Sequence, residues 1–175
     1  MRVRKELLLI VITLTDLFSV NAQNPVNFKL ISATDKSEFI LNNEKGKFIT
    51  LHFLLKTECP FCLRHTQEYF SRAGTLPNVL QVFIKPDTEA DIKAWSGKLP
   101  ADELIRFPIY RDPEANLARQ FNIPFGYVFH NQVVHYPATV LLGPDGNEVF
   151  RYVGKDNSDR LSFDQLAEKV RELTK

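Results

Sequence analysis

The sequence predicts an α/β sandwich with a mixed sheet, and three observations support this class. Short apolar runs of β-type composition alternate with amphipathic helical patterns along most of the chain. Helices separate the earlier strands, and the last two strands form a hairpin around Asp145-Gly146. With 175 residues, 44% of them apolar and 25% charged, the chain has the length and composition of one globular domain with a substantial core.

The first 22 residues have the pattern of a secretory signal peptide. Three basic residues among the first five precede an apolar stretch at 7–14, and residues 20–22 (Val-Asn-Ala) resemble a cleavage site. The apolar stretch is shorter than the roughly 20 residues that span a bilayer as a helix. We therefore expect a periplasmic or secreted protein, folded over residues 23–175, without stable membrane insertion after cleavage. An uncleaved N-terminal anchor is the alternative.

The charge balance gives no reason to expect nucleic-acid binding. Without the first 22 residues the chain carries 19 basic and 19 acidic residues. Non-specific binding to nucleic acid depends on a basic surface, and a neutral chain does not supply one.

The first half of the mature chain contains four predicted strands and two predicted helices. Apolar β-type runs predict strands at 28–31, 38–41, 48–55 and 79–85. A helix is expected from Pro60 to about Arg72, because proline suits the first helical position. Thr88 can cap a second helix to about Trp95, whose first turn carries acidic residues that the helix dipole favours.

The second half predicts three strands and two helices. Strands are expected at 107–110, 133–142 and 148–153, and Asp112-Pro113 opens a helix that continues to Phe121. The chain closes with an amphipathic helix at 163–173, whose apolar side carries Phe163, Leu166, Val170 and Leu173.

The two cysteines of the chain stand in one motif, Cys59-Pro60-Phe61-Cys62, between a strand and a helix. Cys59 falls at the N-cap of that helix, where backbone N–H groups and the helix dipole lower the pKa of a thiol from about 8.5. Cys62 lies one turn deeper and can resolve a mixed disulfide formed at Cys59. Glu58 acts in the opposite direction, because a neighbouring carboxylate disfavours the thiolate.

Two other roles for the cysteine pair fit less well than redox chemistry. A structural zinc site normally takes four Cys or His ligands, and the sequence has no second cysteine pair. A purely structural disulfide across so short a loop removes little entropy from the unfolded chain, so it would stabilise this domain weakly.

The order of these motifs resembles the thioredoxin-like superfamily, specifically its redoxin branch of peroxiredoxins and periplasmic thiol-disulfide oxidoreductases. The resemblance covers about residues 26–174 and rests on segments 46–54, 59–62, 111–121 and 137–146. It implies a three-layer sandwich, with the mixed sheet flanked by helices. It also implies that Pro137 is a cis-proline facing the disulfide, and that Tyr136-Pro137 binds the partner polypeptide.

Three departures from the pattern bear on specificity. Glu58 replaces the tryptophan that precedes the first cysteine in typical thioredoxins, and Pro60-Phe61 replaces Gly-Pro. Lys56 occupies the position where peroxiredoxins carry a hydroxyl residue, with Thr57 one place away. The stretch 126–134 is longer than usual, which fits a hairpin or a partner-facing insertion.

The expected function is thiol–disulfide exchange with protein thiols and disulfides through Cys59 and Cys62, without an organic cofactor or a metal. Glu58, Pro60 and Phe61 would tune the pair. One alternative is a thiol peroxidase with Cys59 peroxidatic and Cys62 resolving. Another is a copper-binding assembly protein that uses both cysteines and His135. The direction of electron flow and the redox partner are not encoded in a recognisable pattern.

The remaining histidines have simpler expected roles. His52 lies within a strand and is expected in the core or on a sheet face. His65 shares the side of the helix that carries Cys62, and we expect it on the surface, with thiol tuning as the alternative. His130 is expected in a loop.

Overall fold

A computed structural model describes residues 27–56 and 59–175 of the chain. The predicted signal peptide, Thr57 and Glu58 lie outside the described residues. Seven strands form one sheet in the order β2-β1-β5-β4-β3-β8-β9, and β6 and β7 form a separate two-stranded sheet. The strands are β1 (Lys29–Ser32), β2 (Glu38–Ile40), β3 (Phe48–Phe53), β4 (Val79–Lys85), β5 (Ile109–Arg111), β6 (Phe125–Phe129), β7 (Gln132–His135), β8 (Ala138–Leu142) and β9 (Glu148–Val153).

The helices cover both faces of this sheet. They are α1 (Pro60–Arg72), α2 (Glu89–Ser96), α3 (Ala101–Arg106), α4 (Asn116–Gln120) and α5 (Phe163–Leu173), with short 3-10 turns η1 (Leu41–Glu44), η2 (Ala73–Thr75) and η3 (Pro113–Ala115). Strands β3, β4 and β5 are parallel, whereas β8 is antiparallel to both β3 and β9. The predicted mixed α/β architecture is therefore confirmed.

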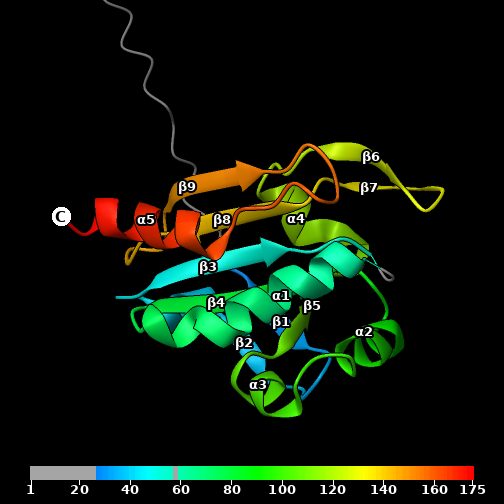
Figure 1. Ribbon diagram of the computed structural model, residues 1–175, viewed down its shortest axis with the longest axis horizontal. Coiled ribbons are helices and arrows are strands. Elements are labelled where there is room, and N and C mark those ends of the chain that lie inside the picture. The colour runs from blue at the N-terminus through cyan, green and yellow to red at the C-terminus, as the bar shows by residue number, and fades with distance from the viewer. Residues whose placement is uncertain (1–26, 57–58) are drawn as a thin grey trace, which may run out of the picture.

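The core consists of two apolar clusters, one on each face of the sheet. One cluster joins the sheet to α1, α2 and α5, and the other joins it to α4 and the β1–β2 hairpin. Figure 1 shows α1 lying across the sheet, with the β6–β7 hairpin at the end of the molecule where α1 begins. The sheet thus brings the cysteine motif and the hairpin to one end of the fold.

Several predicted elements have the expected bounds because local sequence determines them. Helix α1 spans 60–72, α5 spans 163–173 and β4 spans 79–85, as predicted. Thr88 caps α2 by accepting a hydrogen bond from Asp91 N at 3.2 Å. None of the described helices is long and apolar enough to cross a bilayer.

Two predicted elements are interrupted in the structure, and one helix of the structure was not predicted. The strand expected at 133–142 is divided by Tyr136-Pro137, because Tyr136 N donates to Pro124 O at 2.9 Å and the chain changes sheets there. The helix expected from Asp112 to Phe121 is broken by the left-handed backbone of Glu114 and Ala115, with φ of 58° and 52°. Helix α3 buries none of its residues, so it gives no amphipathic pattern to detect.

Candidate active site

The cysteines form a disulfide at the start of α1. Cys59 is the N-cap residue, with φ −89° and ψ 98°, and Pro60 follows at the first helical position. Cys59 Sγ accepts a hydrogen bond from Cys62 N at 2.9 Å, and the two Cα atoms lie 5.1 Å apart. The predicted N-cap geometry is confirmed, and the Cys62 N–H points toward the sulfur that would carry negative charge.

A loop from the C-terminal part of the chain covers this disulfide. Residues 154–162, which we call the covering loop, connect β9 to α5. Asn157 Oδ1 lies 2.9 Å from Cys59 Sγ, and Arg160 Nη2 lies 3.2 Å from Cys62 Sγ and 3.5 Å from Cys59 Sγ. Cys59 is only 1% exposed and Cys62 is fully buried. A macromolecular partner therefore reaches neither sulfur in this conformation of the protein.

Hydrogen bonds to Pro137 and Tyr152, and one within the loop, hold the covering loop in place. Gly154 N donates to Pro137 O at 2.9 Å, and a Cβ at Gly154 would lie 1.9 Å from Asp159 O, so this close crossing requires glycine. The Asp159 carboxylate accepts from Tyr152 Oη and from Lys155 N. These contacts fix the conformation in which Arg160 reaches the sulfurs.

Arg160 and Asn157 contact the sulfurs, and the sequence did not indicate either residue. Arg160 Nε donates to Asn157 O at 3.0 Å and its Nη2 donates to Asn157 Oδ1 at 3.1 Å. Burial lowers the pKa of Arg160 to about 10, so the site holds a desolvated cation beside the disulfide. Arg160 follows the cysteines by about 100 positions, and no local pattern in the sequence connects them.

The residues predicted to bind a partner lie next to the covering loop. The Tyr136 ring packs against the Tyr127 ring at a centroid distance of 5.3 Å, and Tyr127 Oη accepts from Asn157 N at 3.0 Å. The prediction of a cis bond at Pro137 is wrong, because the described residues contain no cis peptide bond. The trans form is the intrinsically favoured one for an X-Pro bond. The partner-binding role of Tyr136-Pro137 stays a prediction.

The other predicted tuning residues are only partly defined by the structure. Phe61 is half-buried and packs against the core, and the guanidinium of Arg64 lies 4.5 Å from its ring centroid. Pro60 occupies the N1 position. Glu58 lies outside the described residues, so its predicted effect on the thiols stays untested.

Two histidines form a buried hydrogen-bonded pair behind the motif. His65 is buried, so its predicted surface position is wrong, whereas the core position of His52 is confirmed. His52 Nε2 lies 2.9 Å from Gln81 Oε1, and His65 Nε2 lies 3.0 Å from His52 Nδ1. With Gln81 Oε1 accepting from His52 Nε2–H, His52 Nδ1 accepts from His65 Nε2–H. This arrangement requires His52 to be neutral.

The buried histidines make stability dependent on pH. Burial lowers the pKa of His52 to about 4 and holds the pKa of His65 well below its usual 6.5. The unfolded chain therefore binds protons that the folded chain does not, and the free energy of unfolding falls as pH decreases from 6.5 toward 4. The expected loss from His52 is up to about 3 kcal/mol.

Urea unfolding at a series of pH values measures this loss, and NMR titration of the ring protons assigns it. The resonances of His52 are expected to stay in the neutral form above pH 5. His130 is exposed and lies in the predicted loop, between β6 and β7. Titration of His52 near 6.5 would contradict the prediction.

A second buried polar cluster fixes the chain just before the motif. Lys85 Nζ donates to Leu55 O at 2.5 Å, lies 3.2 Å from Asp87 Oδ2, and lies 4.6 Å from the Trp95 ring centroid. Lys85 and Asp87 are both buried, and burial lowers the pKa of Lys85. The pair anchors the last turn of backbone before residues 57–58.

His135 takes no part in a metal-binding cluster. Its Nδ1 lies 2.7 Å from Tyr136 O, and its ring packs edge-on against Phe53. Over residues 27–56 and 59–175, no three His, Cys, Asp or Glu side chains are grouped to hold a metal ion. The copper hypothesis therefore has no ligand set in the described part of the chain.

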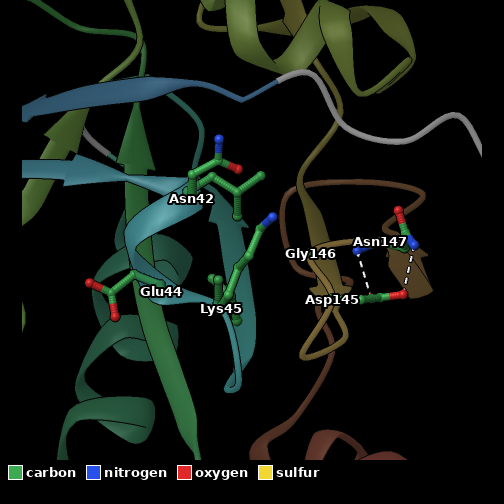
Figure 2. A pocket seen from close by; sticks show the side chains of 8 residues that line it. Asn42, Glu44, Lys45, Asp145, Gly146 and Asn147 are labelled. Atoms are coloured by element: carbon green, nitrogen blue, oxygen red, sulfur yellow. Dashed lines mark hydrogen bonds between the residues drawn. The ribbon is translucent and has the colours of Figure 1, made fainter.

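A polar groove lies at the opposite end of β3 from the cysteines. Figure 2 shows it between η1 and the β8–β9 turn, with Glu44 and Lys45 on one side and Asp145 and Asn147 on the other. Its volume is about 270 Å³. The Asp145 carboxylate accepts hydrogen bonds from Asn147 N and Nδ2, which lower its pKa. Because the Asp145 carboxylate is already hydrogen-bonded within the β8–β9 turn, this groove does not replace the disulfide as the candidate active site.

A dithiol–disulfide pair at the N-terminus of the helix after a central parallel strand, within a mixed sheet covered by helices, defines a redox protein with a thioredoxin-like fold. Residues 20–149 match the AhpC/TSA family. The chain belongs to this family and is a redox enzyme. No curated protein matches the sequence.

Solved structures of both functional branches resemble the chain. A mutant of PrxQ from Xylella fastidiosa has a TM-score of 0.71 at 15% identity, covering 87% of this chain and 93% of that one. The exposed lipoprotein thioredoxin of Streptococcus pneumoniae has a TM-score of 0.66 at 19% identity, covering 84% and 99%. A secreted Mycobacterium tuberculosis disulfide oxidoreductase homologous to E. coli DsbE has a TM-score of 0.60 at 19% identity. The match covers 83% of this chain and 95% of that one. At these identities the likeness shows the fold, and the predicted thioredoxin-like class is confirmed.

Proposed function

We propose that this chain is an exported thiol-disulfide oxidoreductase that exchanges disulfides with protein partners through Cys59 and Cys62. The observation that carries the proposal is the disulfide at the α1 N-terminus, with Cys62 N donating to Cys59 Sγ at 2.9 Å. That geometry stabilises the Cys59 thiolate as a leaving group and as a nucleophile. Tyr136-Pro137, beside the covering loop, is the segment along which the partner binds.

The exchange proceeds through a mixed disulfide. A partner thiolate attacks Cys59 Sγ, the Cys59–Cys62 bond breaks, and its electron pair leaves on Cys62 Sγ. The second partner thiolate then attacks the partner sulfur of the mixed disulfide, which releases Cys59 as a thiolate and the partner as a disulfide. Two electrons pass from the partner to the pair, and the reverse sequence reduces a partner disulfide.

Export is the second part of the proposal. Residues 1–22 act as a signal peptide and residues 23–175 form the redox domain in the periplasm or outside the cell. An exposed lipoprotein and a secreted oxidoreductase among the structures with this fold support this location. Cysteine pairs that exchange disulfides with proteins are also more useful in an oxidising compartment than in the cytosol.

Peroxide reduction by Cys59 is the competing function, which the likeness to PrxQ favours. Stopped-flow kinetics separates the two. The oxidised protein, residues 23–175, is mixed with a reduced unfolded protein, and the reduced protein is mixed with hydrogen peroxide. We expect fast exchange with the protein thiols and peroxide oxidation no faster than that of free cysteine. Rapid oxidation by peroxide together with slow exchange would make the protein a peroxidase instead.

A further inference from the structure

Arg160 places a positive charge against a neutral disulfide. Its guanidinium is within 3.5 Å of both sulfurs, and its other acceptors are the backbone and side-chain oxygens of Asn157. Within residues 27–56 and 59–175, no Asp or Glu carboxylate oxygen lies within 4.0 Å of this guanidinium in an ion pair. The described part of the site therefore holds a cation whose immediate neighbours are uncharged.

The energetic balance of this arrangement differs between the two redox states. A partly desolvated cation without a counter-ion is unfavourable, and disulfide sulfurs carry no charge to balance it. Reduction produces a thiolate within direct contact of the guanidinium, and the Cys62 N–H already points at Cys59 Sγ. An opposite charge at this distance favours the anionic form of the thiol. Arg160 thus stabilises the reduced pair more than the oxidised pair.

We infer that Arg160 shifts Cys59–Cys62 toward the role of electron acceptor, in which the enzyme oxidises pairs of reduced cysteines in exported polypeptides. This inference rests on the proposed function and adds its direction and its substrate class, a protein dithiol. The partner loses two electrons and two protons and gains a disulfide. The Cys59–Cys62 bond breaks, and the reduced pair holds one proton and one thiolate paired with Arg160, while the second proton passes to solvent.

Other ionisable groups near Arg160 do not provide this charge. Arg160 acts electrostatically on three buried histidines, His52, His65 and His135, whose lowered pKa values keep their rings neutral at pH 7. It also acts on Lys85, a cation that is paired with Asp87. Tyr127 Oη lies in the same contact network through Asn157 N. Glu58 lies outside the described residues, and a Glu58→Gln variant measures its contribution independently.

The reduction potential is the direct test, measured by equilibrating the protein, residues 23–175, with glutathione buffers. Arg160→Gln is expected to lower the equilibrium constant for reduction of the pair by about tenfold, which corresponds to about 30 mV for two electrons. Arg160→Lys keeps the charge, so its reduction potential should lie between those of the wild type and Arg160→Gln. Arg64→Gln is the matched control. Arg64 is an exposed cation on α1 that stacks on Phe61, and it forms no hydrogen bond to either sulfur in the described part of the chain.

A second variant keeps the test available if Arg160→Gln does not fold. Asn157→Asp is nearly isosteric and introduces a carboxylate where Asn157 Oδ1 now lies, 3.1 Å from Arg160 Nη2 and 2.9 Å from Cys59 Sγ. It supplies the missing counter-ion and repels the thiolate, so the potential should also fall. In both variants, the midpoint of the pH dependence of Cys59 alkylation should move to higher pH. Loss of packing alone would not produce this shift.

The outcomes separate the inference from the function on which it rests. Potentials of Arg160→Gln and Asn157→Asp that equal or exceed the wild-type value would overturn the role of Arg160, even if exchange with proteins is fast. Absence of exchange between the wild-type protein and any reduced protein would overturn the proposed function, whatever the glutathione equilibrium gives. Fast oxidation of a reduced unfolded protein by wild type, slowed in Arg160→Gln, supports both.

Discussion

Cys59→Ser is expected to abolish thiol–disulfide exchange, whereas Cys62→Ser is expected to stop the reaction halfway. Cys59 occupies the N-cap, where its sulfur accepts the hydrogen bond from Cys62 N. In the proposed mechanism it is the sulfur that an incoming thiolate attacks. A serine hydroxyl cannot form the mixed disulfide, so the loss is complete rather than partial. Cys62→Ser retains the attacking group but lacks the thiol that releases the product.

Non-reducing electrophoresis and intact-mass measurement distinguish the two variants. Each reduced variant is mixed with a protein that carries an accessible disulfide. Cys62→Ser should accumulate a covalent complex with the mass of both proteins, and reductant should dissociate it. Cys59→Ser should give none. A stable complex in Cys59→Ser and none in Cys62→Ser would reverse the assigned roles of the two cysteines.

The parts of the fold that sequence predicted well are those specified by neighbouring residues. The helix at 60–72 combines an N-cap cysteine with proline at N1, and the helix at 163–173 has a regular apolar side. The interruption of the strand at Tyr136-Pro137 depends on a hydrogen bond to Pro124 O. The run from 133 to 142 signals it only through Pro137, and an edge strand also tolerates a proline. Strand β7 therefore belongs to the small sheet, and β8 to the large one.

The candidate site divides in the same way. The cysteine pair was predictable, because its spacing and its position after a strand carry a chemical meaning on their own. Arg160 and Asn157 were not, because the β9–α5 connection brings them to the sulfurs only in the folded chain. His65 was expected on the surface because a lone polar residue on a helix is commonly solvated, but its ring is satisfied by His52.

Asp87→Ala is expected to destabilise the protein by about 3 kcal/mol or more, the largest effect on stability that the structure predicts for a residue that does not contact the disulfide. Lys85 is fully buried, and Asp87 Oδ2, 3.2 Å from its Nζ, provides the nearby negative charge. Among the described residues, removing the carboxylate leaves a buried cation whose remaining contacts are Leu55 O and the Trp95 ring. Because Leu55 lies just before the motif, the loss should also loosen the approach to Cys59.

Urea unfolding near neutral pH measures this cost, and two comparisons isolate its cause. The double variant Lys85→Met, Asp87→Leu removes both charges and should lose much less, since apolar replacement of a buried ion pair is often neutral. Glu168→Ala removes an exposed carboxylate from α5 and should change the free energy of unfolding by about 0.5 kcal/mol at most. The single variant should regain stability as pH rises, because Lys85 can then lose its proton, and burial already lowers its pKa. If Asp87→Ala is no more costly than Glu168→Ala, the buried charge on Lys85 does not depend on Asp87.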